Sequence, residues 1–306
     1  MKDKIRTALK SSLTSILMLS FLSGTPKAFA DDFWSYWGDG KAELSGYKLV
    51  QPRYGQKRNG KAVLIFVTET HSEKEKVKIE GDHTGVPSRD RFSVMKLNDV
   101  RMFQTGIYDY RVTASVFSRV DRKFELSKVS LGVQEWCGHV YHQLVSSGKQ
   151  VQETLHSYFG GEDDQNRGHA IPPGAVFEDN IPILIRELRG PWLKPGEKVE
   201  FAGAPSLLAL RFQHKPFSWG KISVHKSALT GNISTVLGER KAVRWTVSTP
   251  LHGTYTCFVE ADPPHRILKW TSDQGESGEL TGTIRLDYWK LHDEGDESYL
   301  KKLFPK

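Results

Sequence analysis

One long alternating segment stands out in this chain: Tyr108-Asp109-Tyr110-Arg111-Val112-Thr113-Ala114-Ser115-Val116-Phe117-Ser118-Arg119-Val120. From Tyr108 to Val116, every second side chain is apolar, and the residues between them are charged or carry a hydroxyl group. This period of two is typical of a β-strand with one face buried and the other in water. Because the alternation continues for so many residues, the segment predicts a β-strand.

Turn-forming residues lie between further segments of the same kind. Asn59-Gly60 separates strand-like segments at 42–54 and 62–68 and predicts a β-hairpin. Ser147-Gly148-Lys149 has the same position between two later segments. The N-terminal half of the chain is therefore expected to consist of antiparallel strands.

The C-terminal half shows the same succession of strands and turns. Pro250 and Gly253, then Pro263-Pro264, then Gly275 and Gly278 interrupt the apolar segments. The predicted strands are 243–247, 255–259, 267–270 and 280–288. This order predicts a meander of antiparallel strands.

Two predicted strands, Ala62 to Val67 and Leu207 to Leu210, are apolar on both faces and should be covered on both sides. The segment Asp179 to Arg189 can provide a cover, because its apolar residues recur at helical spacing. A second short helix is expected from Glu297 to Phe304. The predicted fold is mainly β: a large antiparallel curved sheet or open barrel, rich in meanders, with one or two short helices.

The first thirty residues predict a secretory signal peptide. A basic start precedes an apolar stretch from Leu13 to Leu22, and Ala28-Phe29-Ala30 forms a small-x-small cleavage site. We expect cleavage after Ala30 and a periplasmic or secreted protein. The apolar stretch is shorter than the ~20 residues that span a bilayer, and no other segment predicts a transmembrane helix.

The remaining residues divide into an N-terminal β half at 31–160, a linker or loop at 161–178 and a C-terminal β half at 179–306. The linker is rich in Gly and polar residues, and it contains Pro172-Pro173-Gly174. Whether the two halves form two domains or one continuous sheet stays open at this point.

The formal net charge of +7 is mostly a property of the signal peptide. Five of the 43 Lys and Arg residues, against one of the 36 Asp and Glu residues, lie in the first thirty positions, which leaves +3 for the rest. Such a balance argues against a nucleic-acid-binding protein, because counterion release needs a concentrated basic face. The only basic cluster in the remainder is the turn from Arg53 to Lys61.

The densest group of reactive side chains lies in the segment 134–142. On a regular strand, Glu135, Cys137, His139 and Tyr141 share one face, where a thiol, an imidazole and a carboxylate could bind a metal or activate a nucleophile. A bulge at Gly138 would separate the thiol from the imidazole. In the alternative interpretation, Trp136 fills the core, Cys137 is buried, and Glu135 and His139 bond their neighbours. No hydrolase elbow, phosphate loop or Cys-x-x-Cys motif is present, and no cofactor is predicted.

Two further sets of residues are candidates for specific roles. The two cysteines, Cys137 and Cys257, could form a disulfide in an oxidising compartment, and the sequence leaves this open. The aromatic segment Asp31 to Gly40 could stack on a ligand through Trp34 and Trp37, or could simply fasten the N-terminus to the sheet. With Tyr141, these two Trp residues are the candidate ligand-binding residues.

Several motifs resemble a group of exported bacterial proteins of unknown function: Gly40 to Tyr47, Gln51 to Gly55, Ala62 to Glu69, Thr105 to Tyr108 and Gln134 to His139. The C-terminal strands, with Leu268-Lys269-Trp270 and Leu280 to Trp289, look like the domain of unknown function DUF3108. Some relatives carry the label septum formation inhibitor Maf. The chemistry of that name belongs to cytosolic α/β proteins and does not fit an exported β protein. The resemblance implies an envelope protein and no particular activity.

Three functions remain compatible with these observations. The first is a periplasmic binding or envelope-maintenance protein that holds an apolar ligand such as a lipid against its sheet. The second is an enzyme or metal-binding protein in which Cys137 is nucleophile or ligand, His139 is base or ligand, and Glu135 orients them. The third is a structural partner of another envelope protein.

Overall fold

The computed structural model describes residues 28–81, 85–162 and 164–305. Of the predicted signal peptide, residues 1–27 lie outside the described residues. The strands of the N-terminal half are β1 (Ala42–Arg53), β2 (Gln56–Ser72), β3 (Arg91–Thr105), β4 (Tyr108–Arg119), β5 (Glu125–Glu135), β6 (Gly138–Ser147), β7 (Gln150–Ser157) and β8 (Gln165–Ala170).

The C-terminal half continues with strands and carries most of the short helices. Its strands are β9 (Val176–Phe177), β10 (Lys198–Ala204), β11 (Gly220–Thr235), β12 (Gly238–Thr249), β13 (Gly253–Glu260), β14 (Ile267–Ser272) and β15 (Ser277–Leu286). The α-helices are α1 (Ala28–Trp37), α2 (Ile181–Leu184), α3 (Leu207–Phe212) and α4 (Leu300–Leu303). Single 3₁₀ turns are η1 (Ser88–Asp90), η2 (Val120–Arg122), η3 (Glu178–Asn180), η4 (Tyr288–Lys290) and η5 (Asp296–Tyr299). None of the helices in the described part of the chain is both long and apolar enough to cross a membrane.

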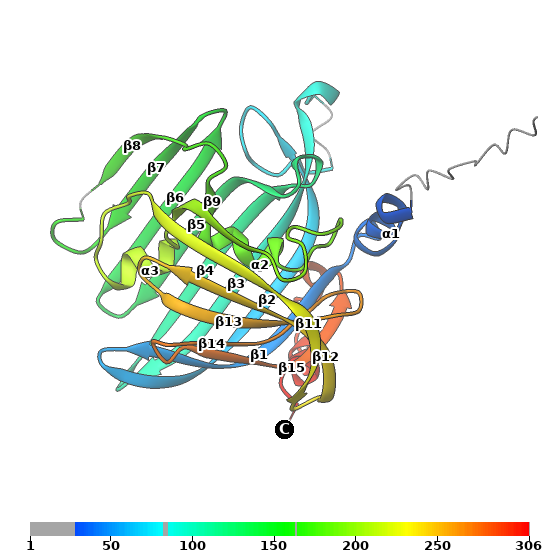
Figure 1. Cartoon of the computed structure of the whole chain (residues 1–306). Coiled ribbons are helices and arrows are strands. Elements are labelled where there is room, and N and C mark those ends of the chain that lie inside the picture. Colours follow the sequence, from blue (N-terminus) through cyan, green and yellow to red (C-terminus); the bar gives the residue numbers. More distant parts are fainter. Residues whose placement is uncertain (1–27, 82–84, 163, 306) are drawn as a thin grey trace, which may run out of the picture.

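All fifteen strands belong to one curved sheet (Figure 1). Their order is β8-β7-β6-β5-β4-β3-β2-β1-β15-β14-β13-β12-β11-β10-β9. Paired strands are antiparallel except β9 and β10, which run parallel. The sheet does not close, because β8 and β9 form its two edges. The prediction of a large antiparallel curved sheet or open barrel is confirmed.

Strand β1 joins the two halves of the chain. Leu44 of β1 pairs with Ile65 of β2 on one side and with Ile284 of β15 on the other. The first and last strands of the sequence are therefore neighbours at the middle of the sheet. The segment 161–178, expected as a loop, contains β8 and β9 and so contributes both edge strands.

The alternating segment at 108–120 forms β4, as predicted. Tyr110, Val112, Ala114 and Val116 are buried in the main core on the concave side of the sheet. The double coverage of 62–67 is also present in β2. Ala62, Leu64 and Phe66 lie in the main core, whereas Val63 and Val67 pack with Leu303 of α4 in a second cluster.

The predicted hairpin at Asn59-Gly60 is wrong. The turn lies at Tyr54-Gly55, where both residues have positive φ values (54° and 71°), and β2 continues through Asn59 and Gly60. A Cβ atom on Gly60 would lie 2.4 Å from the carbonyl oxygen of Met102. Gly60 therefore permits the close approach of β3 and does not form a turn.

The predicted strand at Leu207 to Leu210 is also wrong, because these residues form α3. Ser206 caps this helix, since its hydroxyl oxygen accepts a hydrogen bond from the backbone N–H of Ala209. A short apolar run fits a buried helix as well as a buried strand, so periodicity alone could not decide between them. The expected helix at 179–189 is shorter than predicted and consists of η3 and α2.

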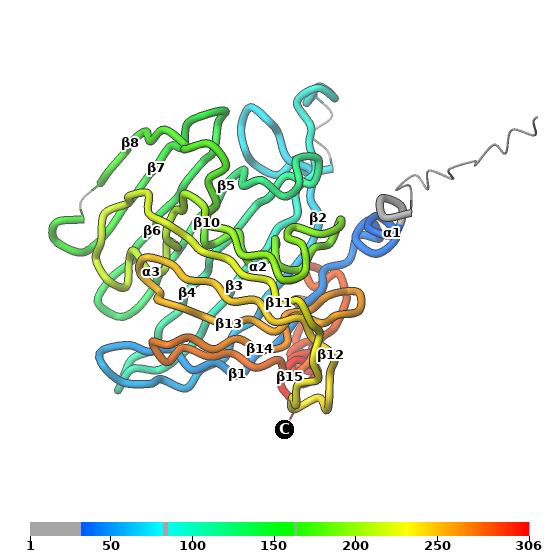
Figure 2. Tube along the Cα trace, viewed as in Figure 1, coloured from blue at the N-terminus to red at the C-terminus, as the bar shows by residue number. Residues whose placement is uncertain are grey.

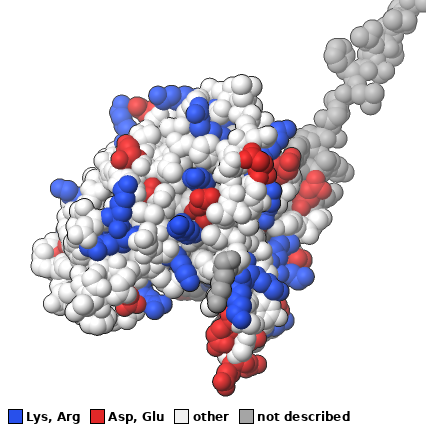
Figure 3. All heavy atoms as spheres, turned by 90° about the horizontal axis from the view of Figure 1, so that it is seen from below, with Lys and Arg blue, Asp and Glu red and all other residues white. Residues whose placement is uncertain are grey.

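The short helices between β9 and β11, among them α2 and α3, lie inside the curve of the sheet (Figure 2). The Asn180 amide donates to the Phe124 carbonyl at 2.7 Å, and the Ser118 hydroxyl bonds the same side chain. Glu178 bonds His252, which lies between β12 and β13. On the face of the molecule seen in Figure 3, Lys and Arg side chains are dispersed among Asp and Glu.

Candidate functional site

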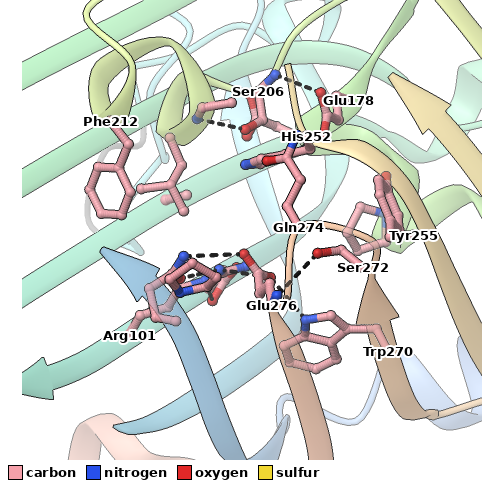
Figure 4. A pocket seen from close by; sticks show the side chains of 18 of the residues that line it. Arg101, Glu178, Ser206, Phe212, His252, Tyr255, Trp270, Ser272, Gln274 and Glu276 are labelled. Atoms are coloured by element: carbon pink, nitrogen blue, oxygen red, sulfur yellow. Dashed lines mark hydrogen bonds and ion pairs between the residues drawn. The ribbon is translucent and has the colours of Figure 1, made fainter. Parts of the chain in front are cut away.

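A cavity of about 350 Å³ lies on the concave side of the sheet (Figure 4). Strands β1 to β4 form one wall, β13 and β14 form another, and η3 and α3 cover it. Most of its surface is apolar, with side chains from Leu64, Leu97, Ala114, Val116, Pro182, Leu208, Ala209, Phe212, Ile267 and Trp270. The curvature of the sheet thus leaves a chamber that the short helices only partly fill.

The chamber opens to solvent at one end of the sheet. Exposed residues line it there: Tyr54 in the β1–β2 turn, Gln213 after α3 and Gln274 in the β14–β15 turn. The Arg53 guanidinium closes part of this opening. Its Nη1 donates to the Phe212 carbonyl at 2.9 Å, and its Cζ lies 4.4 Å from the centre of the Phe212 ring.

A group of charged side chains, the Arg101 cluster, lies on one wall and consists of Asp99, Arg101 and Glu276. Arg101 Nη2 is 2.9 Å from Asp99 Oδ2, and its Nη1 is 3.0 Å from Glu276 Oε1. The Trp270 indole donates to the same Glu276 oxygen at 2.9 Å. Burial alone would raise the pKa of Glu276, but the charge of Arg101 lowers it below its ordinary value. The cluster is therefore ionised and internally paired.

A second charged pair, the His252 pair, lies on the other side of the chamber and consists of His252 and Glu178. The imidazole Nδ1 is 2.6 Å from Glu178 Oε1, and Glu178 Oε2 accepts the backbone N–H of Ser206 at 3.0 Å. Burial lowers the pKa of His252, but the charge and hydrogen bond of Glu178 outweigh it and raise that pKa to about 9. His252 is thus an imidazolium at neutral pH, and its Nε2 bonds no described residue.

Asp179 lies next to this pair in η3. Its Oδ2 accepts the backbone N–H of Leu207 at 2.9 Å, at the start of α3. Within the described residues, no Lys, Arg or His forms an ion pair with this carboxyl group. Burial raises the pKa of Asp179 to about 7, with a smaller contribution from Glu178. The carboxyl group therefore changes its ionisation near neutral pH.

This arrangement can bind an amphipathic molecule. The apolar walls can contact an apolar group in the chamber, and the charges of the Arg101 cluster are already paired. His252 Nε2 can donate a hydrogen bond, and Asp179 can donate or accept one according to its ionisation. Within the described ranges, no group of three or more His, Cys, Asp or Glu side chains is placed to hold a metal ion.

The structure separates the residues of the predicted Glu135, Cys137 and His139 site. They do not lie on one strand: Glu135 ends β5, Trp136 and Cys137 form a two-residue turn, and Gly138 begins β6. Glu135 is buried, whereas His139, which pairs with Gln134, is exposed on the opposite face of the sheet. The shared face fails because the chain reverses at this point.

The local contacts also differ from those of an activated thiol. The Glu135 carboxylate accepts the backbone N–H of Cys137 at 2.8 Å. Its hydrogen bond to the thiol, followed by slight burial, raises the pKa of Cys137 and favours the protonated form. The expected burial of Trp136 and Cys137 is wrong as well, because both side chains are exposed.

Both cysteines are free, so the Cys137 to Cys257 disulfide is not formed. Cys137 lies at the tip of the β5–β6 hairpin, whereas Cys257 lies in β13 with its side chain at the cavity wall. Burial, followed by the charge of Glu276, raises the pKa of Cys257 to about 12. The two thiols thus occupy an exposed turn and a buried wall.

None of the three predicted ligand-binding aromatic residues lines the chamber. Trp37 is buried in α1 and Trp34 is partly exposed on the same helix. Tyr141 lies on the outer face, where its hydroxyl donates to Gln143 at 2.8 Å. The helix α1 fastens the N-terminal segment through Phe33 and Trp37, in agreement with the structural alternative.

The polar residues of the chamber were missed by the sequence analysis. Asp99 and Arg101 share a strand face with Leu97 and Phe103, and two charges on an otherwise buried face were the available signal. Glu178, Asp179, His252 and Glu276 follow no common spacing, because three separate turns bring them together. Only the fold shows that they surround one space.

The fold and the site define a class: an open, curved β-sheet protein with a ligand-sized chamber inside the curve. No family model matches the chain, and no curated protein matches it. The predicted resemblance to DUF3108 therefore stays a prediction.

Solved structures that are similar to this chain include two from families of unknown function. The beta-barrel-like DUF1849 protein from Brucella abortus is 9% identical, with a TM-score of 0.46, over 81% of this chain and 98% of that one. A DUF1089 family protein from Pseudomonas aeruginosa is 10% identical, with a TM-score of 0.33, over 56% of this chain and 82% of that one.

Proposed function

We propose that this protein is exported to the periplasm and binds a small amphipathic ligand, such as a lipid, in the chamber inside the curved sheet. The observation that carries the proposal is the chamber itself, with about 350 Å³ of space, mostly apolar walls and a few polar groups on two sides. Small-molecule sites in proteins have this size and this combination of lining residues.

The lining groups suggest how such a ligand lies. Its apolar part packs against Leu97, Val116 and Phe212, whose burial of apolar surface supplies the affinity. Its polar end reaches His252 Nε2 and the carboxyl group of Asp179, two lining groups that can form further hydrogen bonds. The opening beside Tyr54 and Gln274 gives the ligand a path in and out.

Export is the second part of the proposal, and the N-terminal sequence supports it. A basic start, an apolar stretch and an Ala-x-Ala site precede Phe33, whose side chain is buried. N-terminal mass determination on the protein recovered from its own cells tests this part. An unprocessed chain recovered from the cytosol would contradict it.

Ligand binding is tested by native mass spectrometry of protein purified from the compartment in which it resides, followed by solvent extraction. We expect a bound mass that denaturation releases. The blocking variant is Ala114→Phe, which places a ring in the chamber from β4. It should abolish the bound mass, because the added side chain occupies the ligand's space.

The matched control is Thr113→Phe. It also introduces a Phe ring, but one residue earlier, where the side chain is exposed on the outer face of β4. This variant should retain the ligand. A wild-type protein that carries no ligand and takes up no lipid added during refolding would overturn the proposal. Equal ligand binding by the Ala114→Phe variant and wild type would show that the ligand binds outside the chamber.

A further inference from the structure

The hairpin tips at one end of the sheet expose large apolar side chains. Exposed fractions are 57% for Tyr54, 81% for Ile107, 69% for Trp136 and 64% for Tyr158. We call these four residues, three of which are aromatic, the aromatic rim. Large apolar side chains that are exposed together mark interaction surfaces, since burial elsewhere would be more favourable.

The topology places the rim at a single end of the molecule. Tyr54, Ile107 and Trp136 lie in the turns β1–β2, β3–β4 and β5–β6, and Tyr158 follows β7. Because strands β1 to β7 are consecutive and antiparallel, alternate turns lie at the same end of the sheet. The turns that carry the rim therefore lie at one end of the sheet (Figure 1).

Aromatic contacts join the tips into a continuous row. The hydroxyl groups of Tyr54 and Tyr110 are 2.6 Å apart, and the ring centres of Tyr108 lie 5.9 Å from Tyr110 and 6.3 Å from Trp136. Tyr158 lies over the start of β6, where a Cβ atom on Gly138 would be 2.4 Å from its ring. The row thus extends from the mouth of the chamber to β7.

The turn at Trp136 is built to hold that side chain outward. Glu135 is buried, and its carboxylate accepts the backbone N–H of Cys137, which fixes the two-residue turn between them. Trp136 then projects from the tip and touches only Tyr108 among the rings of the described residues. The motif that the sequence presented as a reactive cluster is therefore a support for an exposed Trp.

The charge beside the rim is positive. From Leu44 to Thr68, which includes the β1–β2 turn but leaves out Glu43 and Glu69 at the far ends of the two strands, the chain has five Lys and Arg residues and no Asp or Glu. Lys57 is exposed next to the tip, and Arg58 is partly exposed. On the β3–β4 hairpin, Asp109 is paired with Arg111 at 3.1 Å. A row of aromatic rings beside unbalanced cations suits the interface of an anionic bilayer.

We propose that the aromatic rim docks this protein on an anionic lipid bilayer, with Trp136, Tyr54 and Ile107 in the interface and Lys57 and Arg58 at the headgroups. Tyr54 also lines the mouth of the chamber, so docking turns that mouth toward the lipid. The docking surface lies outside the chamber. It is tested separately from ligand binding.

Vesicle flotation tests the proposal, with phosphatidylcholine vesicles that contain or lack phosphatidylglycerol. The protein is recovered from its own compartment, and every variant has the same N-terminus as wild type. We expect wild type to float with the anionic vesicles, and less at high salt. The double variant Ile107→Ser, Trp136→Ser should bind at least about tenfold more weakly, because two large apolar side chains no longer enter the interface.

The matched control is Trp289→Ser. Trp289 is also exposed, at 48%, but it follows β15 at the opposite end of the sheet. This variant should float like wild type. Absence of wild-type flotation, or equal losses in the Trp289 variant and the rim variant, would overturn the proposal. A rim that serves a protein partner would give no wild-type binding to pure vesicles and is thereby distinguished.

Ligand occupancy of the rim variant separates the two proposals. Neither Ile107 nor Trp136 lines the chamber, so bound ligand should still be detected in the rim variant by native mass spectrometry. Loss of flotation with retained ligand supports docking by the rim. Flotation without any bound ligand would contradict the proposed chamber function and leave docking in place.

Discussion

The imidazole Nδ1 of His252 lies 2.6 Å from Oε1 of Glu178, and this contact joins the β12–β13 turn to the segment inside the sheet. Burial lowers the pKa of His252, but Glu178 raises it further, from the ordinary 6.5 to about 9. A folded-state pKa above the unfolded one means that folding is favoured by protonation. The pair therefore stabilises the fold below pH 6.5, and this stabilisation is lost as the pH rises through about 9.

The substitution His252→Gln measures this contribution. At pH 6 the free energy of unfolding should fall by about 3 kcal/mol relative to wild type. The difference should shrink steadily between pH 7 and pH 9, as wild-type His252 loses its proton. Urea denaturation at a series of pH values measures it. A difference that stays constant across this range would show that His252 is not charged in the folded protein.

Asp179 should make stability fall with rising pH as His252 does, but at lower pH, because burial raises the pKa of its carboxyl group from 3.8 to about 7. The folded state then binds a proton more tightly than the unfolded state between these pH values, so stability falls as the pH rises from about 4 to 7. Asp179→Asn removes the charge and keeps an acceptor for Leu207. It should stabilise the protein by up to about 4 kcal/mol at pH 8 and change little at pH 4.

The control for this prediction is Asp99→Asn in the Arg101 cluster. Asp99 is ion-paired with Arg101 at 2.9 Å, so its neutralisation should destabilise the fold at pH 8. Opposite signs for the two Asp→Asn variants are expected in the same denaturation experiment. A destabilised Asp179 variant at pH 8 would mean that its carboxylate is favourably placed when charged.

Many strands could be predicted from the sequence, because alternating apolar and polar side chains indicate a strand with one buried face. This holds for β4, where Tyr110, Val112, Ala114 and Val116 are buried as expected. It fails where a glycine has a tertiary role. Gly60 permits the approach of β3, and the sequence cannot distinguish such a glycine from one in a turn.

The chamber could not be predicted, because its charged groups come from distant parts of the chain. Glu178 and His252 are 74 residues apart and meet only when η3 lies inside the sheet. The sequence instead indicated Glu135, Cys137 and His139, which are close in sequence but flank a reversal of the chain. Nearness in sequence shows a shared site only when the backbone continues in one direction.

The ion pair of Glu43 and Arg186 is almost fully buried, and removing one partner should be costly. Arg186 Nη1 lies 2.9 Å from Glu43 Oε1, and the same guanidinium donates to the carbonyl groups of Pro264 and His265. Arg186→Met should lower the free energy of unfolding by about 3–5 kcal/mol, since it leaves Glu43 buried and unpaired. Urea denaturation at pH 7 measures the loss.

A double-mutant cycle separates the pair from its surroundings. The variant Glu43→Leu, Arg186→Met leaves no unpaired charge, so it should be more stable than Arg186→Met alone. The exposed pair of Lys221 and Glu200, with atoms 2.7 Å apart, is the control, and its removal should leave the free energy of unfolding nearly unchanged. A double variant as unstable as Arg186→Met would show that the stability is lost through the missing hydrogen bonds of Arg186 to the Pro264 and His265 carbonyl groups.

The two thiols should differ sharply in reactivity. Cys137 is exposed, whereas Cys257 is buried and has a pKa raised to about 12. Ellman's reagent should therefore titrate one thiol in the native protein and a second only after unfolding. Because Glu135 raises the pKa of Cys137, its alkylation rate by iodoacetamide should still be rising at pH 9. An alkylation rate that has already reached its plateau below pH 7 would indicate an activated thiolate and support the catalytic interpretation of Cys137. The absence of free thiols after unfolding would indicate a disulfide between the two cysteines.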